Sequence, residues 1–152
     1  AGAILYGIEP YRGAFAGTSF RPALTWQTRI ALLRDLPAGM PIGYSGTYTL
    51  KRPSRIATLA VGYADGLPRR LSNCGSVLIR GERFPIIGRV SMDQCQVDVT
   101  DASTPLALGE TVTLLGSDGP ASQTILDLAE LLETTPHEPP CALTQRVPRR
   151  YV

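Results

Sequence analysis

Three tyrosines stand among glycines, where a phenol can project into space that another molecule enters. Tyr44 and Tyr48 lie in Ile-Gly-Tyr-Ser-Gly-Thr-Tyr, and Tyr63 lies in Val-Gly-Tyr-Ala-Asp-Gly. A phenol ordinarily ionises near a pKa of about 10, so acid–base work at neutral pH requires a stabilised phenolate. Guanidinium groups such as those of Arg69 and Arg89 can contribute that stabilisation. The structural alternative is that each tyrosine packs at one end of a domain and donates a single hydrogen bond.

Charge and composition exclude several other kinds of chemistry. The 152 residues suffice for one domain with a core, and a net charge of +2 does not favour nucleic acid or a membrane surface. Only Lys51 can form an imine, and it stands in a polar loop. Three widely spaced cysteines and a single histidine, His137, predict no metal site and no disulfide framework. They favour reduced thiols in the cytoplasm.

The stretch Phe84–Thr100 is predicted to be the strand that carries reactive residues. Cys95, Val97 and Val99 alternate with polar residues, which is the period of a half-buried strand. The pattern breaks around Gly88, and glycine inside a strand is typical of a bulge or bend. We therefore expect one strand with an irregular first half. A β-bulge with a solvated arginine is the alternative interpretation.

Most of the remaining chain is predicted to be β-structure. Further strands are expected over residues 1–7, 23–33, 56–63, 76–79 and 112–115, with Trp26 in the core. Arg80-Gly-Glu-Arg83 is predicted to be a hairpin turn. The fold class is thus all-β, as an antiparallel, Greek-key-like β-barrel.

One short helix is predicted near residues 122–134. Ile125, Leu128 and Leu132 recur with helical spacing, Ser122 is the expected N-cap, and Pro136 is expected to end the helix.

Four motifs, in order along nearly the whole chain, resemble the C-terminal domain of alanine racemase. They are Gly43-Tyr44-Ser-Gly-Thr-Tyr48, Gly62-Tyr63-Ala-Asp-Gly66, Gly88-Arg89-Val-Ser-Met92-Asp93 and Arg146-Val-Pro-Arg149. Members of that family combine an N-terminal (β/α)₈ barrel, which holds pyridoxal 5′-phosphate on a lysine, with a C-terminal β-domain, and work as homodimers.

The resemblance implies a domain division and an activity. Residues 1–20 would be the end of a truncated (β/α)₈ barrel and a connector, and residues 21–152 the β-barrel domain. The complete protein would convert L-alanine to D-alanine for peptidoglycan precursors in the cytoplasm. The cofactor lysine would lie outside this chain, because Lys51 matches no cofactor-lysine motif. The chain alone would then be inactive.

The resemblance also assigns roles in and around an active site. Tyr44 corresponds to the catalytic base, acting in the partner subunit's site on the face opposite the lysine. Met92 corresponds to a substrate-binding residue. Tyr63, Arg69 and Arg89 correspond to residues that line the entrance.

A second set of residues corresponds to the binding site of the cofactor phosphate. Backbone N–H groups near Gly2 and Ala3 match the positions that meet the phosphate in the family. His137 stands where the family usually has a tyrosine near that phosphate, and a loop histidine without a role is the alternative.

Two other functions remain open on the sequence. A serine or broad-specificity amino-acid racemase would carry the same motifs. A non-catalytic β-barrel that binds a partner or an oligonucleotide through Arg69, Arg70, Arg80 and Arg89 is a different class, and it would need aromatic side chains exposed among those arginines.

Overall fold

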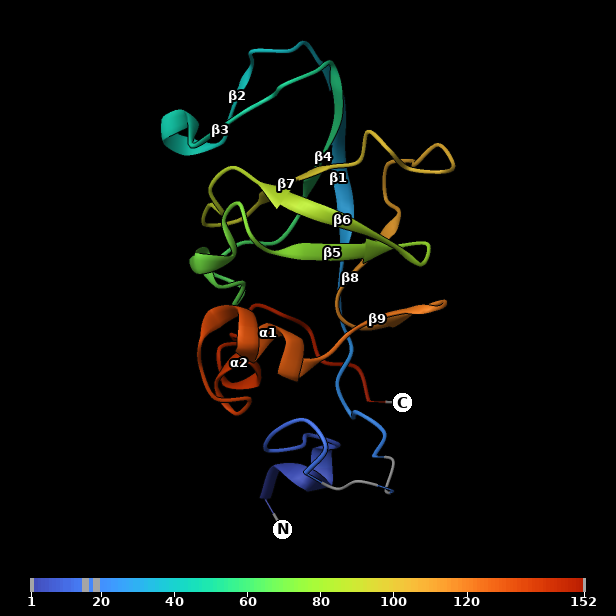
Figure 1. The fold of residues 1–152 in the computed structure, drawn as a ribbon, viewed down its shortest axis with the longest axis vertical. Helices are drawn as coiled ribbons and strands as arrows, with labels where there is room; N and C mark the ends of the chain where they lie inside the picture. The colour runs from blue at the N-terminus through green and yellow to red at the C-terminus, as the bar shows by residue number, and fades with distance from the viewer. Residues whose placement is uncertain (1, 15–16, 18–19, 152) are drawn as a thin grey trace.

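The computed structural model describes residues 2–14, 17 and 20–151, and β-strands dominate them (Figure 1). The strands are β1 (Trp26–Leu36), β2 (Pro41–Ile42), β3 (Tyr48–Thr49), β4 (Ser54–Leu59), β5 (Ser76–Ile79), β6 (Glu82–Ile87), β7 (Cys95–Asp98), β8 (Thr111–Asp118) and β9 (Ala121–Gln123). The α-helices are α1 (Ile125–Leu132) and α2 (Glu138–Cys141), and the 3₁₀ turns are η1 (Gly2–Tyr6), η2 (Tyr44–Gly46) and η3 (Arg69–Leu71).

The long strand β1 brings the two edges of the main sheet together. Its C-terminal half pairs with β4, where Leu33 faces Ala57, and its N-terminal half pairs with β8, where Thr28 faces Val112. The pairings therefore run in a ring, β1–β4–β7–β6–β5–β8 and back to β1, with β9 added beside β8. All of these pairs are antiparallel, and a ring of pairings is what a closed barrel requires. The predicted all-β antiparallel class is confirmed.

The core lies between the inward faces of these strands. Trp26 is 6% exposed, and Cys95 and Val97 are fully buried, as the alternation in the sequence predicts. Complete burial of a large apolar side chain contributes about 1.5–3 kcal/mol. Burial also raises the pKa of the Cys95 thiol to about 12. Cys74 and Cys141 are exposed, and all three thiols are free.

The prediction of one interrupted strand over Phe84–Thr100 is wrong. The stretch contains two antiparallel strands, β6 and β7, and residues 88–94 form the loop between them. Gly88 has φ of 71° and ends β6, because a left-handed backbone cannot continue the pleat. The residues that break the alternation therefore lie in a loop at one end of the sheet.

The prediction of a buried strand over residues 1–7 is also wrong over its described part. Residues 2–6 form the 3₁₀ turn η1, and Gly2 and Gly7 both have positive φ. Tyr6 is 64% exposed. Residue 1 lies outside the described residues.

The predicted helix is confirmed as α1, but its caps differ from the prediction. Thr124 is the N-cap, not Ser122, because Ser122 belongs to β9 and pairs with Ser117 of β8. Thr124 and Asp127 form a reciprocal capping box, and Glu133 ends the helix in a left-handed conformation before Pro136 is reached. The short helix α2 was not predicted, since its Glu-Pro-Pro-Cys sequence has no apolar period.

Candidate functional site

Tyr44 stands at the tip of the β2–β3 hairpin, where its side chain is 70% exposed. The turn η2 begins after Gly43, which has φ of 71°. Ile42 and Leu50 anchor the hairpin in a small apolar cluster with Ile56, and Tyr48 packs against that cluster. Tyr48 thus has the packing role that the sequence left open, whereas Tyr44 projects outward.

Close backbone contact holds the Tyr44 turn against residues 88–93 of the loop between β6 and β7, which are called the 88–93 loop below. A Cβ atom added to Gly43 would lie 2.8 Å from the backbone nitrogen of Arg89. A Cβ atom on Gly88 would lie 2.8 Å from the carbonyl oxygen of Ile42. Both distances are too short for a side chain, so the two glycines allow the segments to touch. The position of Tyr44 therefore depends on the 88–93 loop.

The other end of the same loop holds Met92 against Tyr63. The backbone N–H of Tyr63 donates to the carbonyl of Ser91, and that of Ala64 donates to the carbonyl of Met92, each at 3.0 Å. A Cβ atom on Gly62 would lie 2.3 Å from the Met92 carbonyl oxygen, so this contact also requires glycine. Tyr63 and Met92 remain 47% and 53% exposed. Both side chains can therefore reach a molecule outside the domain.

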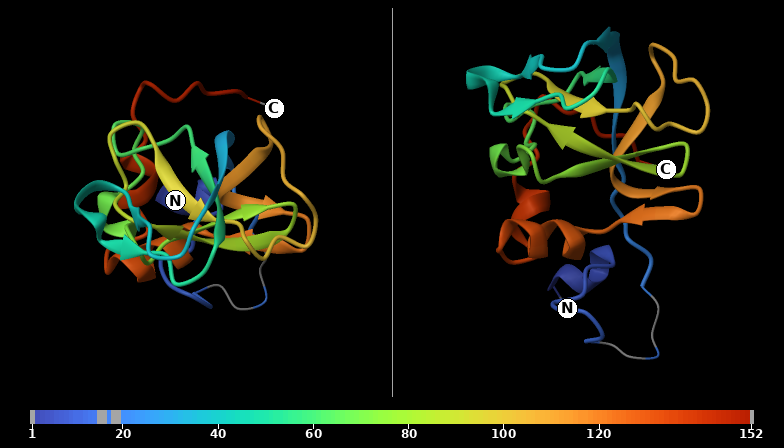
Figure 2. Two further views of the ribbon diagram at one scale, coloured as in Figure 1. Left: turned by 90° about the horizontal axis from the view of Figure 1, so that it is seen from above. Right: turned by 45° about the horizontal axis from the view of Figure 1, so that its top comes forward.

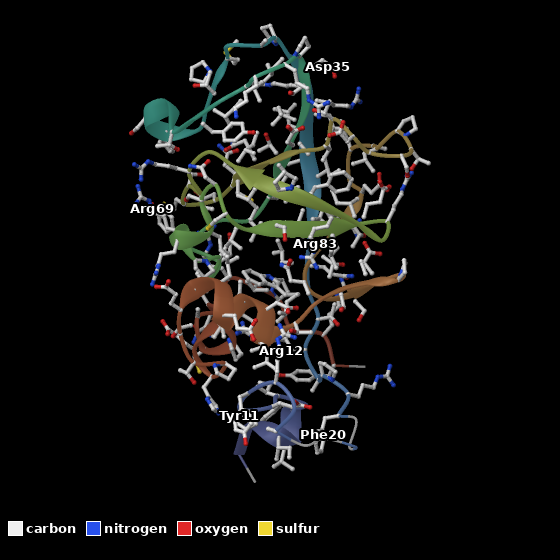
Figure 3. The ribbon with its side chains drawn as sticks, in the orientation of Figure 1. Tyr11, Arg12, Phe20, Asp35, Arg69 and Arg83 are labelled. Carbon is white, nitrogen blue, oxygen red and sulfur yellow. The ribbon has the colours of Figure 1, made fainter. Side chains whose placement is uncertain are left out.

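The two predicted entrance arginines differ in their surroundings. The Arg89 side chain is partly buried, and its Nε atom is fully buried with no hydrogen-bond partner among the described residues. Arg69 begins η3 and is exposed, and Figure 3 shows it at the edge of the molecule that also carries η2. The loop 88–93 thus brings Tyr44, Tyr63, Met92 and Arg89 together, and Arg69 lies on the same side.

The residues predicted to bind a phosphate lie elsewhere. Gly2 and Ala3 belong to η1 at the N-terminal end of the molecule, and η2 lies at the opposite end of its long axis (Figures 1 and 2). His137 directly precedes α2, is exposed, and shares a 3.0 Å hydrogen bond through Nδ1 with the Thr135 hydroxyl. One copy of the chain therefore does not bring Gly2 and Ala3 to Tyr44.

Ion pairs tie the N-terminal segment to α1. The Arg12 guanidinium donates to Glu130 at 2.8 Å and also contacts Asp127, and Figure 3 shows Arg12 between η1 and α1. These carboxylates raise the pKa of Arg12. The segment that carries Gly2 and Ala3 is thereby held beside the helical end of the domain, where His137 also lies.

Asn73 and Ser72, which follow η3, were not predicted as site residues. Their side chains form hydrogen bonds to the segments that carry Tyr44 and Arg89. Asn73 accepts a 2.6 Å hydrogen bond from Gly88 N–H and donates to Thr47 at 3.2 Å. The Ser72 hydroxyl accepts from Val90 N–H at 3.0 Å. The available signal was the sequence Ser-Asn-Cys-Gly, since asparagine tolerates positive φ and bonds to nearby backbone.

The four arginines of the alternative binding module do not form a free basic strip. Arg70 pairs with Glu133 at 3.4 Å, and Arg80 pairs with Glu110 and donates to Thr104. Two of the four guanidinium groups therefore already have carboxylate partners. The described part of the chain contains no helix long and apolar enough to cross a bilayer. It also contains no cluster of three or more histidine, cysteine or acidic residues able to hold a metal ion.

Comparison with known sequences identifies the family. Residues 23–151 match the family described as "Alanine racemase, C-terminal domain". The chain belongs to the alanine racemase C-terminal domain family. It is 47% identical over 150 residues to the alanine racemase of Halothermothrix orenii and 46% identical over 151 residues to that of Symbiobacterium thermophilum. These alignments cover 99% of this chain but only 39% and 40% of the relatives, so the chain spans about two fifths of their length.

Solved alanine racemases share this fold. The enzyme of Bartonella henselae, whose crystal structure contains covalently bound pyridoxal phosphate, aligns with a TM-score of 0.91 at 35% identity. That alignment covers 99% of this chain and 40% of the other. The alanine racemase of Clostridium difficile in complex with cycloserine aligns with a TM-score of 0.92 at 35% identity, over 100% of this chain and 40% of the other.

Proposed function

We propose that this chain is the C-terminal domain of a pyridoxal-phosphate-dependent alanine racemase and that Tyr44 is one of its two catalytic bases. The complete protein would interconvert L- and D-alanine in the cytoplasm and so supply D-alanine for peptidoglycan precursors. The carrying observation is an exposed phenol, 70% accessible, held by glycine contacts against the loop that also presents Met92. The names of the relatives support the substrate.

The domain division follows from the same family. Residues 21–152 would form the β-domain, in agreement with the family match over residues 23–151. Residues 1–20 would be the end of a preceding (β/α)₈ barrel and a connector. The part of the relatives that this chain does not span would supply the cofactor lysine, since Lys51 is an exposed residue after β3.

The separation of the two predicted sites favours a homodimer. The turn η2, which carries Tyr44, and the turn η1, which carries Gly2 and Ala3, lie at opposite ends of one copy, yet a racemase needs its base and its cofactor at the same small substrate. A partner subunit that presents its own η2 to this chain's N-terminal end meets that requirement. Tyr44 would therefore act in the partner's site.

The residues predicted to meet the cofactor fit a phosphate. Gly2 has φ of 36°, and apart from Gly2 itself and its chain neighbours no atom of the described residues lies within 4 Å of the position that its Cβ would occupy. An anion can therefore approach the backbone N–H groups that open η1. The His137 ring is exposed, and only Nδ1 has a hydrogen-bond partner among the described residues, so Nε2 can meet a phosphate oxygen. When bound, pyridoxal phosphate would take up the electron pair left at Cα after proton removal.

In the proposed mechanism, this chain moves a proton at one face of the substrate. The Tyr44 phenolate oxygen would accept the Cα proton of one enantiomer and become a phenol, and in the reverse direction the phenol would return that proton to the same face. Met92 would limit the space beside the substrate. Tyr63, Arg69 and Arg89 would line the entrance and exclude water from the reacting carbon.

The test uses the complete protein with L-alanine and measures the formation of D-alanine. Tyr44→Phe should lower kcat about 10²- to 10⁴-fold, which is the usual contribution of a general acid–base group. The visible absorbance of bound pyridoxal phosphate should persist, because the lysine lies elsewhere. Tyr151→Phe is the matched control, since Tyr151 is 95% exposed and outside the site. Near-normal racemisation by Tyr44→Phe would remove this residue from the mechanism.

A further inference from the structure

Arg146 joins two acidic residues that belong to different motifs of the site. Its Nη2 atom lies 2.7 Å from Oδ1 of Asp93, and its Nε atom lies 3.5 Å from Oδ1 of Asp65. Asp93 directly follows Met92, and Asp65 stands two residues after Tyr63. One guanidinium group therefore spans the loop that carries Met92 and the turn that carries Tyr63.

Asp65 transmits this contact to the backbone beside Tyr63. Its second carboxylate oxygen, Oδ2, accepts a 2.9 Å hydrogen bond from the N–H of Gly62. The Asp65 side chain is only 16% exposed, whereas those of Arg146 and Asp93 are 49% and 60% exposed. The partly buried carboxylate thus holds the Tyr63 turn on one side and Arg146 on the other.

The chain around Arg146 is fastened to the same turn. The Thr144 hydroxyl donates to the carbonyl of Ala64 at 2.8 Å, and the Thr144 N–H donates to the carbonyl of Asp65 at 3.2 Å. A Cβ atom on Gly66 would lie 2.5 Å from the carbonyl oxygen of Ala142. Arg149 donates to the carbonyls of Leu143, Thr144 and Val147, which folds the C-terminal segment back on itself. Arg146 therefore starts from a fixed backbone.

We propose that Arg146 is a positioning residue: through Asp65 and Asp93 it sets the spacing between Tyr63 and Met92 at the substrate entrance. This inference rests on the proposed function, which assigns substrate and entrance roles to those two residues. Arg146 itself need touch neither substrate nor cofactor. The role requires an arginine, because its planar guanidinium group can bind two carboxylates at once, whereas a lysine ammonium group is a single point charge.

Kinetics should reveal this role in KM more than in kcat. Surface ion pairs contribute little to folding, so loss of the fork should leave the domain folded and loosen one loop against the other. In the complete protein, Arg146→Met should raise KM for L-alanine about three- to tenfold and change kcat less than twofold. The KM of Arg146→Lys for L-alanine should lie between those of wild type and Arg146→Met. Arg150→Met is the matched control, because Arg150 is exposed and its side chain makes no hydrogen bond or ion pair among the described residues.

Hydrogen exchange tests the geometry without any assay of activity. The amides of Tyr63 and Ala64 donate to the 88–93 loop, so Arg146→Met should speed their exchange in the complete protein, and Arg150→Met should not. Asp93→Asn should give a similar effect. In the double variant Arg146→Met/Asp93→Asn, these amides should exchange no faster than in Arg146→Met alone, since Arg146→Met already removes the ion pair between Arg146 and Asp93.

The measurements distinguish a failure of the proposed function from a failure of the positioning role of Arg146. If the wild-type protein does not racemise alanine, the proposed function fails, while the exchange rates still report on the spacing. If wild type is active but Arg146→Met matches Arg150→Met in KM and in exchange, the positioning role is refuted. Additive effects of Arg146→Met and Asp93→Asn would also refute it.

Discussion

The side chain of Asn73 accepts a 2.6 Å hydrogen bond from the backbone N–H of Gly88. The same side chain donates to the hydroxyl of Thr47, which caps the C-terminal end of η2. Asn73 adopts φ of 63°, which asparagine tolerates better than most residues. One side chain therefore links the turn that carries Tyr44 to the start of the 88–93 loop.

Removal of this link should displace Tyr44. Asn73→Gly keeps the backbone freedom and removes both side-chain hydrogen bonds. It leaves the buried Gly88 N–H without its partner, at a cost of about 1–3 kcal/mol. We expect kcat for alanine racemisation by the complete protein to fall about tenfold or more. The kcat of Asn73→Ala should fall further, because alanine adds backbone strain at positive φ. Full activity of Asn73→Gly would mean that the two side-chain hydrogen bonds do not position Tyr44 and that Asn73 is needed only for its positive φ.

Gly43→Ala should disturb the site through contact with the loop and not merely through strain. Gly43 and Gly109 have similar φ, 71° and 78°, but only Gly43 places its Cβ position 2.8 Å from another backbone atom. Gly109→Ala therefore supplies the control for a Cβ atom placed at positive φ without a close contact. In the complete protein, racemisation should fall at least tenfold more in Gly43→Ala than in Gly109→Ala. Equal losses in the two variants would exclude the close contact as the cause.

The sequence predicts strands better than the connections between them. Residues 76–79 form β5 as expected, because a run of buried apolar residues meets a clear turn at Arg80. The break at Gly88 is visible in the sequence, but alternation cannot distinguish a bulge from a loop between two strands. Likewise, Ser122 and Thr124 are equally good N-caps by type, and only the pairing of β9 with β8 selects Thr124.

The individual site residues follow from motifs, but their neighbours do not. Gly43 and Gly88 are close in space because two segments 45 residues apart meet at one end of the sheet. Local patterns carry no information on such a contact. The roles of Asn73 and Arg146 are invisible for the same reason, since their partners are 15 and 53 residues away.

The cap of α1 should make local stability depend on pH. Burial disfavours the charged Asp127 carboxylate, but hydrogen bonds from Thr124 and Arg12 outweigh burial, so the pKa of Asp127 is lowered. The folded state therefore binds this proton more weakly than the unfolded state does. The stabilisation is fully present above the unfolded pKa of about 3.9 and is lost as pH falls through the lower folded pKa.

Hydrogen exchange of the α1 peptide in the complete protein measures this effect. Protection should fall as the pH is lowered below about 4, after correction for intrinsic exchange. Asp127→Asn should lose about 0.5–2 kcal/mol of protection at pH 7 and show a weaker dependence on pH. Glu133→Gln, at the other end of the helix, should keep the wild-type dependence. A dependence unchanged by Asp127→Asn would assign it to another group.

His137 should affect the choice between alanine and serine. Imidazole is shorter than the phenol that the family usually has at this position, so it would leave space beside Tyr44 where a hydroxymethyl group could fit. The shape of a pocket alone discriminates against a substrate with an added hydroxyl by only about 10²-fold, so we expect measurable racemisation of serine beside that of alanine. His137→Tyr in the complete protein should shift the ratio of kcat/KM toward alanine. His137→Phe separates bulk from hydrogen bonding, since an equal shift would assign the effect to bulk alone. If neither variant moves the ratio, His137 is a loop residue without a role in specificity.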